Sequence, residues 1–201
     1  MVGVLIREAR AVLMASGFSR RFGAEDKLLY PFRGKPLASY TVELACGMPE
    51  FSDVVMVAGS DEVAALASGT RARIVRNGAP ERGVRESIKL GVGASGAEHF
   101  CFFPCDQPLM EAYVARALLE RAAPGVIVEP VSGGLPGSPS VFSRSFRDEL
   151  VSIPDGEGGA YVKKRNRSAV ISVNFDDERV FADVDTLREL RHIMEVRPCT
   201  R

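Results

Sequence analysis

No excess of either charge marks this sequence, because 26 lysines and arginines balance 26 aspartates and glutamates among its 201 residues. A neutral chain has no overall field that attracts nucleic acid or an anionic membrane surface. We therefore expect neither nucleic acid nor a membrane among its partners. An anionic ligand would have to be held by a local cluster of positive side chains.

Long apolar runs are also missing. No window approaches the roughly 20 apolar residues that a membrane-spanning helix requires. The opening stretch MVGVLIREARAVLM carries charges at Arg7, Glu8 and Arg10 and has no small-residue cleavage site. It does not resemble a secretory signal peptide, so the sequence predicts a cytoplasmic protein.

Histidine and cysteine are scarce. The four cysteines are scattered along the chain, at Cys46, Cys101, Cys105 and Cys199. Cys101 and Cys105 flank the apolar stretch FFP, which predicts two buried thiols. No second pair of ligands with metal-binding spacing accompanies them, so a structural zinc site is not expected. His99 and His192 likewise have no partner ligands at metal-binding spacing, so no metal-binding role is expected for them.

What the sequence does contain is a regular alternation of apolar runs and helical patterns. The strand-like runs cover 11–15, 53–59, 72–77, 99–108 and 125–131, and the helical patterns between them cover 35–48, 61–69, 83–94 and 111–123. Gly69 is a candidate C-cap for the second of these helices. Strands that are apolar throughout and separated by helices predict a parallel sheet covered on both faces.

After Gly133 the pattern changes. The stretch GGLPGSPSVFS is rich in Gly, Pro and Ser and ends in a short strand-like SVF. The remaining predicted elements are helices over 143–153 and 186–196, a glycine loop opening a basic helix over 155–166, and short strands over 168–175 and 180–185. Thr186 is a candidate N-cap of the last helix. No repeat, linker or clean break interrupts the chain, which predicts a single α/β domain over residues 1–201.

Ligands of an open parallel sheet bind beyond the carboxyl ends of its strands. The first loop at such a position, ASGFSRRFGAEDK, follows the first strand directly. Gly17 and Gly23 let the backbone approach an anion closely, and exposed backbone N–H groups in such a turn form an anion-binding concavity. A hydroxyl and three cations accompany them: Ser19, Arg20, Arg21 and Lys27. The loop therefore predicts a polyphosphate site, the alternative being a solvated turn with surface arginines. Neither the dinucleotide glycine pattern nor the Walker sequence occurs in it.

Two further loops carry carboxylates. Asp106 ends an apolar run just before a proline, where it could bind Mg²⁺ together with substrate phosphates or could cap the following turn. Asp183 and Asp185 lie two apart in a segment predicted to be extended, so their side chains should point the same way. One of them could complete a metal site, or both could simply lead into the last helix. Taken together, the three loops suit attack on a nucleoside triphosphate.

Several stretches resemble one family in the same order along nearly the whole chain: MASGFSRRFGAEDKLL, FRGKPL, NGAPERGVRESIKLGV, CDQP, GLPGSPSVFS and ADVDT. They are similar to the nucleotidyltransferases that activate molybdopterin. The resemblance is strongest to the molybdenum cofactor cytidylyltransferases, in the branch of molybdenum hydroxylase accessory proteins. It implies a three-layer α/β/α Rossmann-like sheet of the nucleotide-diphospho-sugar transferase type, mostly parallel.

The resemblance also implies an activity. This is Mg²⁺-dependent transfer of CMP from CTP to the terminal phosphate of molybdopterin, with release of pyrophosphate and with a molybdenum hydroxylase as the enzyme served. Position by position, it places Arg21 and Lys27 on the triphosphate, Asp106 on magnesium and Asp183 near the metal. The nucleotide-binding residues it implies are Ala15, Ser16, Gly17, Ser19, Gly23 and Ser87. The residues it implies for the pterin substrate are Gly134, Pro136, Gly137 and Pro139.

The chain departs from the family pattern at several points. The usual AAG is ASG, with Ser16 at the position where alanine accompanies cytidylyl transfer and glycine guanylyl transfer. GAEDK resembles the longer guanylyltransferase loop, whereas SRRFG and CDQP favour the cytidylyl side. DGEGG replaces the usual GDxGG, which weakens any role for Asp155. The basic stretch YVKKRNR could meet an anionic substrate or could be a solvated helix end.

Two alternatives to the cytidylyltransferase remain. One is a guanylyl or sugar-phosphate nucleotidyltransferase of the same superfamily. The other is a non-catalytic protein that binds the mature cofactor and delivers it to a hydroxylase. A pure carrier would need the pocket but no metal-binding carboxylate, so Arg21, Lys27 and Asp106 together favour the enzyme.

Overall fold

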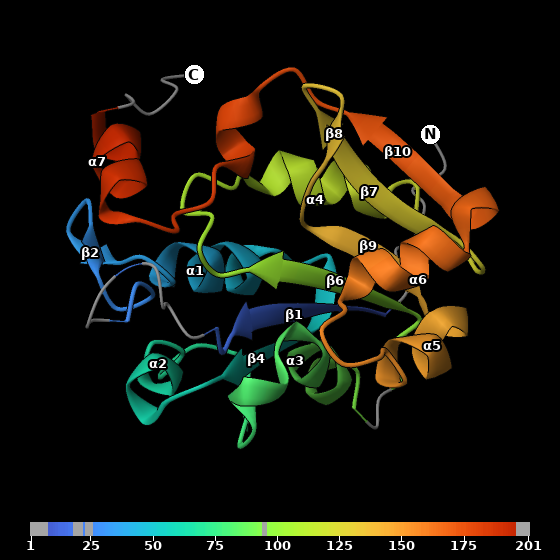
Figure 1. Cartoon of the computed structure of the whole chain (residues 1–201), viewed down its shortest axis with the longest axis horizontal. Helices are drawn as coiled ribbons and strands as arrows, with labels where there is room; N and C mark the ends of the chain where they lie inside the picture. Colours follow the sequence, from blue (N-terminus) through green and yellow to red (C-terminus); the bar gives the residue numbers. More distant parts are fainter. Residues whose placement is uncertain (1–7, 18–21, 23–25, 94–95, 196–201) are drawn as a thin grey trace.

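The computed structural model describes residues 8–17, 22, 26–93 and 96–195. Its main feature is an eight-stranded sheet with the strand order β10-β7-β9-β6-β1-β4-β5, in which β8 pairs with β7 (Figure 1). The strands of this sheet are β1 (Ala9–Ala15), β4 (Phe51–Ala58), β5 (Arg73–Arg76), β6 (His99–Pro104), β7 (Ile127–Ser132), β8 (Leu135–Pro136), β9 (Ser140–Ser143) and β10 (Val170–Asn174). A separate two-stranded hairpin consists of β2 (Pro31–Phe32) and β3 (Lys35–Pro36).

The sheet is mostly parallel, as predicted. β1 lies between β4 and β6 and is parallel to both, β4 is parallel to β5, and β7 is parallel to β10. The exceptions are β9, which lies antiparallel between β6 and β7, and the two-residue β8, which is antiparallel to β7. The stretch SVF is therefore a strand, and it runs against both of its neighbours.

Helices cover both faces of the sheet (Figure 1). The α-helices are α1 (Ser39–Gly47), α2 (Asp61–Ala65), α3 (Val84–Val92), α4 (Ala112–Leu119), α5 (Arg147–Val151), α6 (Gly159–Arg165) and α7 (Leu187–Glu195), and the 3-10 turns are η1 (Pro80–Arg82), η2 (Arg144–Phe146), η3 (Arg167–Ala169) and η4 (Glu178–Phe181). Residues of α1, α2, α4 and α7 belong to one hydrophobic cluster, and residues of α3, α5 and α6 belong to a second. Among the described residues, no helix is long and apolar enough to cross a membrane.

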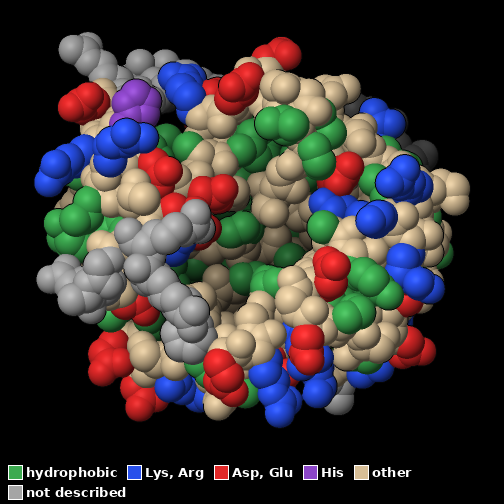
Figure 2. All heavy atoms as spheres, in the orientation of Figure 1, with side chains coloured by type: hydrophobic (Ala, Val, Ile, Leu, Met, Phe, Trp, Pro, Cys, Tyr) green, Lys and Arg blue, Asp and Glu red, His purple; other side chains and the backbone are tan. Residues whose placement is uncertain are grey.

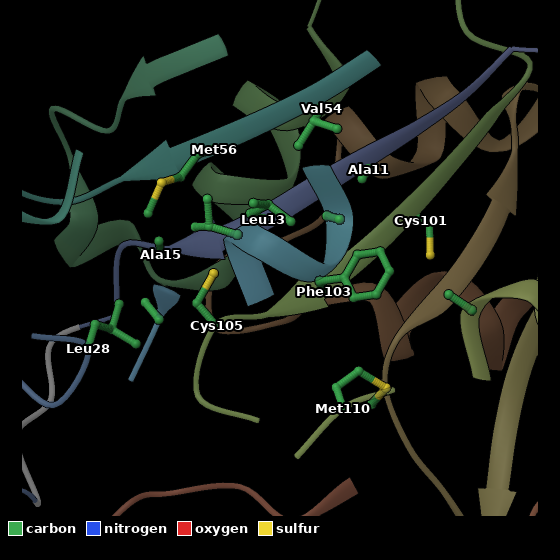
Figure 3. Close-up of a cluster of buried hydrophobic side chains, with 14 of the residues drawn as sticks. Ala11, Leu13, Ala15, Leu28, Val54, Met56, Cys101, Phe103, Cys105 and Met110 are labelled. Atoms are coloured by element: carbon green, nitrogen blue, oxygen red, sulfur yellow. The ribbon is translucent and has the colours of Figure 1, made fainter. Parts of the chain in front are cut away.

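Alternate residues of β1 supply the two clusters, because successive side chains of a strand point to opposite faces. Leu13 belongs to the first cluster and Val12 to the second. Leu13 lies between its register partners, Met56 of β4 and Phe103 of β6, as Figure 3 shows. Cys101 and Cys105 are buried in the same cluster, which confirms the prediction for these two thiols.

Three predicted elements differ from the structure. The helix expected over 61–69 ends at Ala65, and its C-cap is Leu66 and not Gly69. The helix expected over 35–48 begins only at Ser39, because Arg33 and Gly34 turn the chain with positive φ and Pro36 pairs in the hairpin. The strand expected over 180–185 is wrong: the 3-10 turn η4 ends at Phe181, and irregular backbone follows. The side chains of this segment make long-range contacts, described below, and its backbone pairs with no strand.

Candidate active site

A cleft of about 870 Å³ opens on the sheet face that carries α3 and α6, and Figure 2 shows this face hollowed near its middle. Its floor and walls come from β1, β6, β9, α3 and α6, through Met14, Phe102, Phe142, Ser87, Ile88, Gly159, Ala160 and Lys163. Ser16 and Gly17, which follow β1, and Asp106 and Gln107, which follow β6, line its edge. The cleft therefore reaches the carboxyl ends of parallel strands, where ligands of such sheets bind.

Lys27 connects two of the loops that sequence analysis singled out. Its Nζ lies 2.7 Å from Asp106 Oδ2 and 2.8 Å from Asp185 Oδ1, and its side chain is 12% exposed. Burial would lower the pKa of Lys27, but the charges of Asp106 and Asp185 and their hydrogen bonds raise it above its ordinary value. A fully protonated ammonium is thus held at the edge of the cleft. Asp106 is not a helix cap: its side chain bonds Lys27, and the N-cap position of α4 is Glu111.

Asp183 is fixed beside this group by Gln107. The Nε2 of Gln107 donates to Asp183 Oδ1 at 2.9 Å, and the backbone N–H of Val184 donates to the carbonyl of Asp106 at 2.9 Å. Burial raises the pKa of Asp183, and the negative charges of Asp106 and Asp185 raise it further, against the hydrogen bond from Gln107. Three carboxylates therefore concentrate negative charge at one edge of the cleft.

The donor set fits magnesium. Asp106, Asp183 and Asp185 offer hard carboxylate oxygens, and Mg²⁺ commonly takes one or two carboxylates and completes its shell with water and substrate phosphates. Within the described ranges, no group of three or more His, Cys, Asp or Glu side chains is already arranged as a metal site. Phosphate oxygens would therefore have to supply part of the coordination. The ammonium of Lys27 already lies on two of the three carboxylates.

A buried polar triad lies where the loop after β1 meets α3 at the cleft. Ser16 and Ser87 share a hydrogen bond between their hydroxyls at 2.5 Å, and Nδ2 of Asn77 donates to both oxygens, at 3.1 and 3.4 Å. The Oδ1 of Asn77 accepts from the backbone N–H of Ala79, which fixes the direction of the amide. Asn77 therefore holds two serines that both line the cleft.

The structure brings most of the described candidate residues to one cleft. Those that line it are Ser16, Gly17, Ser87, Asp106, Asp183, Pro136 and Gly137, with Lys27 in contact through its carboxylate partners. Ala15, Gly134 and Pro139 do not line it: Ala15 is buried at the end of β1, and Gly134 and Pro139 flank β8. Ser19, Arg20, Arg21 and Gly23 lie outside the described residues.

Sequence reasoning assigned no role to Asn77 or Gln107. Both occur in stretches that carried the resemblance, NGAP and CDQP, but their partners lie 61 and 76 residues away in sequence. For the stretch YVKKRNR, which contains Lys163, the sequence allowed either contact with an anionic substrate or a solvated helix end. Asp155 is ion-paired with Arg85. Thr186 caps α7 as predicted: its Oγ1 accepts from the N–H of Glu189, whose carboxylate accepts from the N–H of Thr186.

Two curated relatives match nearly the whole chain. The chain is 27% identical over 199 residues to the molybdenum cofactor guanylyltransferase of Ralstonia pickettii, covering 92% of this chain and 96% of that protein. It is 28% identical over 194 residues to the nicotine blue oxidoreductase of Paenarthrobacter nicotinovorans, covering 91% and 95%.

A solved structure shares the fold. Rv0371c of Mycobacterium tuberculosis superposes with a TM-score of 0.80 at 22% identity, covering 94% of this chain and 98% of that one. The same protein has also been solved in complex with manganese, with a TM-score of 0.71. The neighbours share the nucleotide-diphospho-sugar transferase fold, as the resemblance implied. Residues 11–170 match the model of the MobA-like NTP transferase domain, so the chain belongs to that family.

Proposed function

We propose that this chain transfers CMP from CTP to the terminal phosphate of molybdopterin and releases pyrophosphate, with Mg²⁺ as cofactor, for the maturation of molybdenum hydroxylases. The observation that carries the proposal is the position of Lys27 between Asp106 and Asp185 at the edge of the cleft. This group combines a permanent cation with carboxylates suited to a metal, and nucleotidyl transfer depends mainly on positioning and neutralising charge. The molybdenum cofactor named for the Ralstonia relative and the manganese complex of the structural neighbour support the substrate and the metal.

In the proposed reaction, an oxygen of the acceptor phosphate attacks the α-phosphorus of CTP. A new P–O bond forms, the bond between the α-phosphorus and the oxygen that bridges it to the β-phosphate breaks, and pyrophosphate leaves. The acceptor phosphate is already anionic at neutral pH, so the chain needs no general base.

Two groups of this chain serve that step. Lys27 stabilises the charge that builds on the α-phosphate and the departing pyrophosphate. Asp106 and Asp183, with Asp185 beside them, hold the cation. Bound magnesium would supply charge neutralisation on the phosphate oxygens. Arg21 is proposed to assist Lys27.

The polar triad supports cytosine as the base. The amide group of Asn77 donates to both Ser16 and Ser87, and the hydroxyl of one serine donates to the hydroxyl oxygen of the other. One hydroxyl hydrogen therefore stays available for donation into the cleft. The pairing edge of cytosine offers two adjacent acceptors, N3 and O2, whereas that of guanine offers one acceptor, O6, beside two donor groups. A hydroxyl donor at this position thus finds two possible acceptors on cytosine and one on guanine, and this is the support that the triad gives to CTP.

An oxidoreductase is a second reading, because the Paenarthrobacter relative carries that name. The sequence does contain the dinucleotide glycine spacing, GVGASG, at residues 91–96. That fingerprint works only between a strand and the helix that follows it. Here its first two residues, Gly91 and Val92, are the last two of α3, and the next element is the strand β6, so the order of helix and strand is the reverse of the one required. The geometry favours the transferase.

Pyrophosphate release by the purified chain with Mg²⁺ and molybdopterin, measured separately with CTP, GTP and ATP, tests the proposal. We expect release with CTP, none with Asp106→Ala, and a lower ratio of CTP to GTP activity with Asn77→Ala. Release with GTP alone would overturn the cytidylyl assignment. No release with any nucleotide, together with tight binding of the nucleotide-bearing cofactor, would identify a delivery protein instead.

A further inference from the structure

A lysine and a glutamate form a buried ion pair on the α6 side of the cleft. The Nζ of Lys163 lies 2.7 Å from Glu129 Oε2 and 3.4 Å from Ser140 Oγ. The two side chains are 18% and 12% exposed. Lys163 and Ser140 line the cleft, whereas Glu129 lies behind them on β7.

Lys163 gives the cleft its positive charge at this end. Among the described residues that line the cleft, it is the one Lys or Arg, against the carboxylates Asp106, Asp183, Asp185 and Glu178. An ammonium carries three N–H donors, and the described contacts with Glu129 and Ser140 use two of them. One donor is therefore available to a molecule in the cleft.

Stability alone does not account for this pair. A buried ion pair roughly breaks even with well-packed apolar residues, because removing two charges from water costs about as much as their attraction returns. The apolar side chains of Phe142 and Pro130 also line this part of the cleft. They reduce the contact of the pair with water, which strengthens the attraction of Lys163 for an incoming anion.

The pair is separate from the carboxylate group. Ser140 pairs with Phe102 of β6, four residues before Asp106. At about 3.3 Å per residue along an extended chain, these four residues span roughly 13 Å of backbone. We therefore expect a phosphate that reacts beside Lys27 to lie away from Lys163, so that a second group of the same molecule would contact Lys163.

We propose that Lys163 binds a second anionic group of the acceptor, distant from the phosphate that reacts. The inference rests on the proposed function, which places the reacting phosphate at Lys27. For molybdopterin, the second group is either its dithiolene sulfurs or the oxyanion of bound molybdenum. Glu129 and Ser140 hold the ammonium in place before the acceptor arrives, which reduces the entropy lost on binding.

Equilibrium binding of molybdopterin, with and without bound molybdenum, tests the proposal in the absence of nucleotide and metal ion. The variants are Lys163→Met, Lys163→Arg and the double variant Lys163→Met/Glu129→Gln. The double variant removes both charges, so that no carboxylate stays buried without its partner. Lys164→Met is the matched control, because Lys164 follows on the same helix and is exposed. KM values for the acceptor and for CTP are measured in parallel.

We expect Lys163→Met and the double variant to weaken acceptor binding about tenfold to a hundredfold, the range for losing a hydrogen bond to a charged group. The acceptor KM should rise equally, the CTP KM should stay constant, Lys163→Arg should recover most of the binding, and Lys164→Met should match the wild type. A loss confined to the molybdenum-loaded acceptor identifies the oxyanion, and a loss with both forms identifies the sulfurs.

Acceptor binding within twofold of the wild type in a folded double variant overturns the inference, even where CMP transfer is observed. If the wild type binds the acceptor through Lys163 but transfers no nucleotide, the proposed function fails and the binding site stands. A wild type that does not bind the acceptor overturns both.

Discussion

At the scale of single residues, Lys27 has the clearest consequence for activity. Its ammonium is held at 2.7 and 2.8 Å from two carboxylates, and its raised pKa keeps it charged at neutral pH. Lys27→Ala should lower turnover, measured as pyrophosphate release, by on the order of 10²–10³, as for loss of one charge-stabilising donor. Lys89→Ala, an exposed position on α3, is the control. A loss below tenfold would show that Lys27 does not act on the phosphates.

The sequence pointed to some of these residues and not to others, for a physical reason. Lys27, Asp106 and Ser87 lie in local motifs, so their roles were predictable and stay predictions until tested. Asn77 and Lys163 are recognised only by what they contact. Asn77 bonds Ser16 from 61 positions away, and Lys163 reaches Ser140 from 23 positions away. One sequence does not show such contacts.

At the scale of helices and strands, the close packing of α3 on β1 depends on the small size of residue 91. A Cβ placed on Gly91 would lie 2.2 Å from Val12 Cγ1, far inside van der Waals contact. Gly91→Ala should therefore lower the free energy of unfolding by about 1–3 kcal/mol, the usual cost of overpacking. Urea unfolding measures this loss.

Two further variants make the test specific. Gly47→Ala, in α1, adds a Cβ that meets no atom within 4 Å and should leave stability nearly unchanged or slightly raised. Combining Gly91→Ala with Val12→Ala should cost less than the sum of the two single losses, since Val12 Cγ1 is removed. Additive losses would show that the clash is not the cause.

Strands and helices were predicted correctly where the spacing of apolar residues reflects burial. They were predicted wrongly where the backbone is held by residues far away in the sequence. β1, β4 and β6 are apolar throughout because both of their faces are covered. The segment 180–185 has strand-like composition, yet Asp183 and Asp185 bond Gln107 and Lys27, and Val184 bonds the backbone of Asp106. These contacts hold the chain across the strand ends instead of beside a strand. The antiparallel direction of β9 likewise depends on its neighbours, not on its own four residues.

At the scale of the whole molecule, acid should weaken the ion pairs that join β4 to its neighbours β1 and β5. Asp53 of β4 is ion-paired with Arg10 at 2.7 Å and Arg73 at 2.8 Å, and Arg10 also donates to the carbonyls of Gly91 and Val92. Burial would raise the pKa of Asp53, but the hydrogen bond from Arg73 and the charge of Arg10 lower it below its ordinary value.

The sign of the effect follows from the lowered pKa. Asp53 contributes stability above the pKa of an unfolded aspartate, about 4, and this contribution is lost as the pH falls through the lower folded value. The difference in unfolding free energy between the wild type and Asp53→Asn should therefore be constant from pH 7 to about 5 and shrink below pH 4. Urea unfolding over this pH range provides the measurement. A difference that grows on acidification would contradict the assignment.

Across the whole chain, the alternation of strands and helices predicted the α/β architecture. That residues 1–201 form a single domain stays a prediction.

The reversed direction of β9 has a consequence for how the protein could diversify. Because β9 runs backwards, its first residue, Ser140, rather than its last, faces the cleft beside Phe102. The proposed acceptor side of the cleft is lined by one continuous segment from β7 to α6, whereas Ser16, Ser87 and Asp106 come earlier in the sequence. Exchange of that segment between relatives would be a route to a new acceptor with the nucleotide half inherited intact.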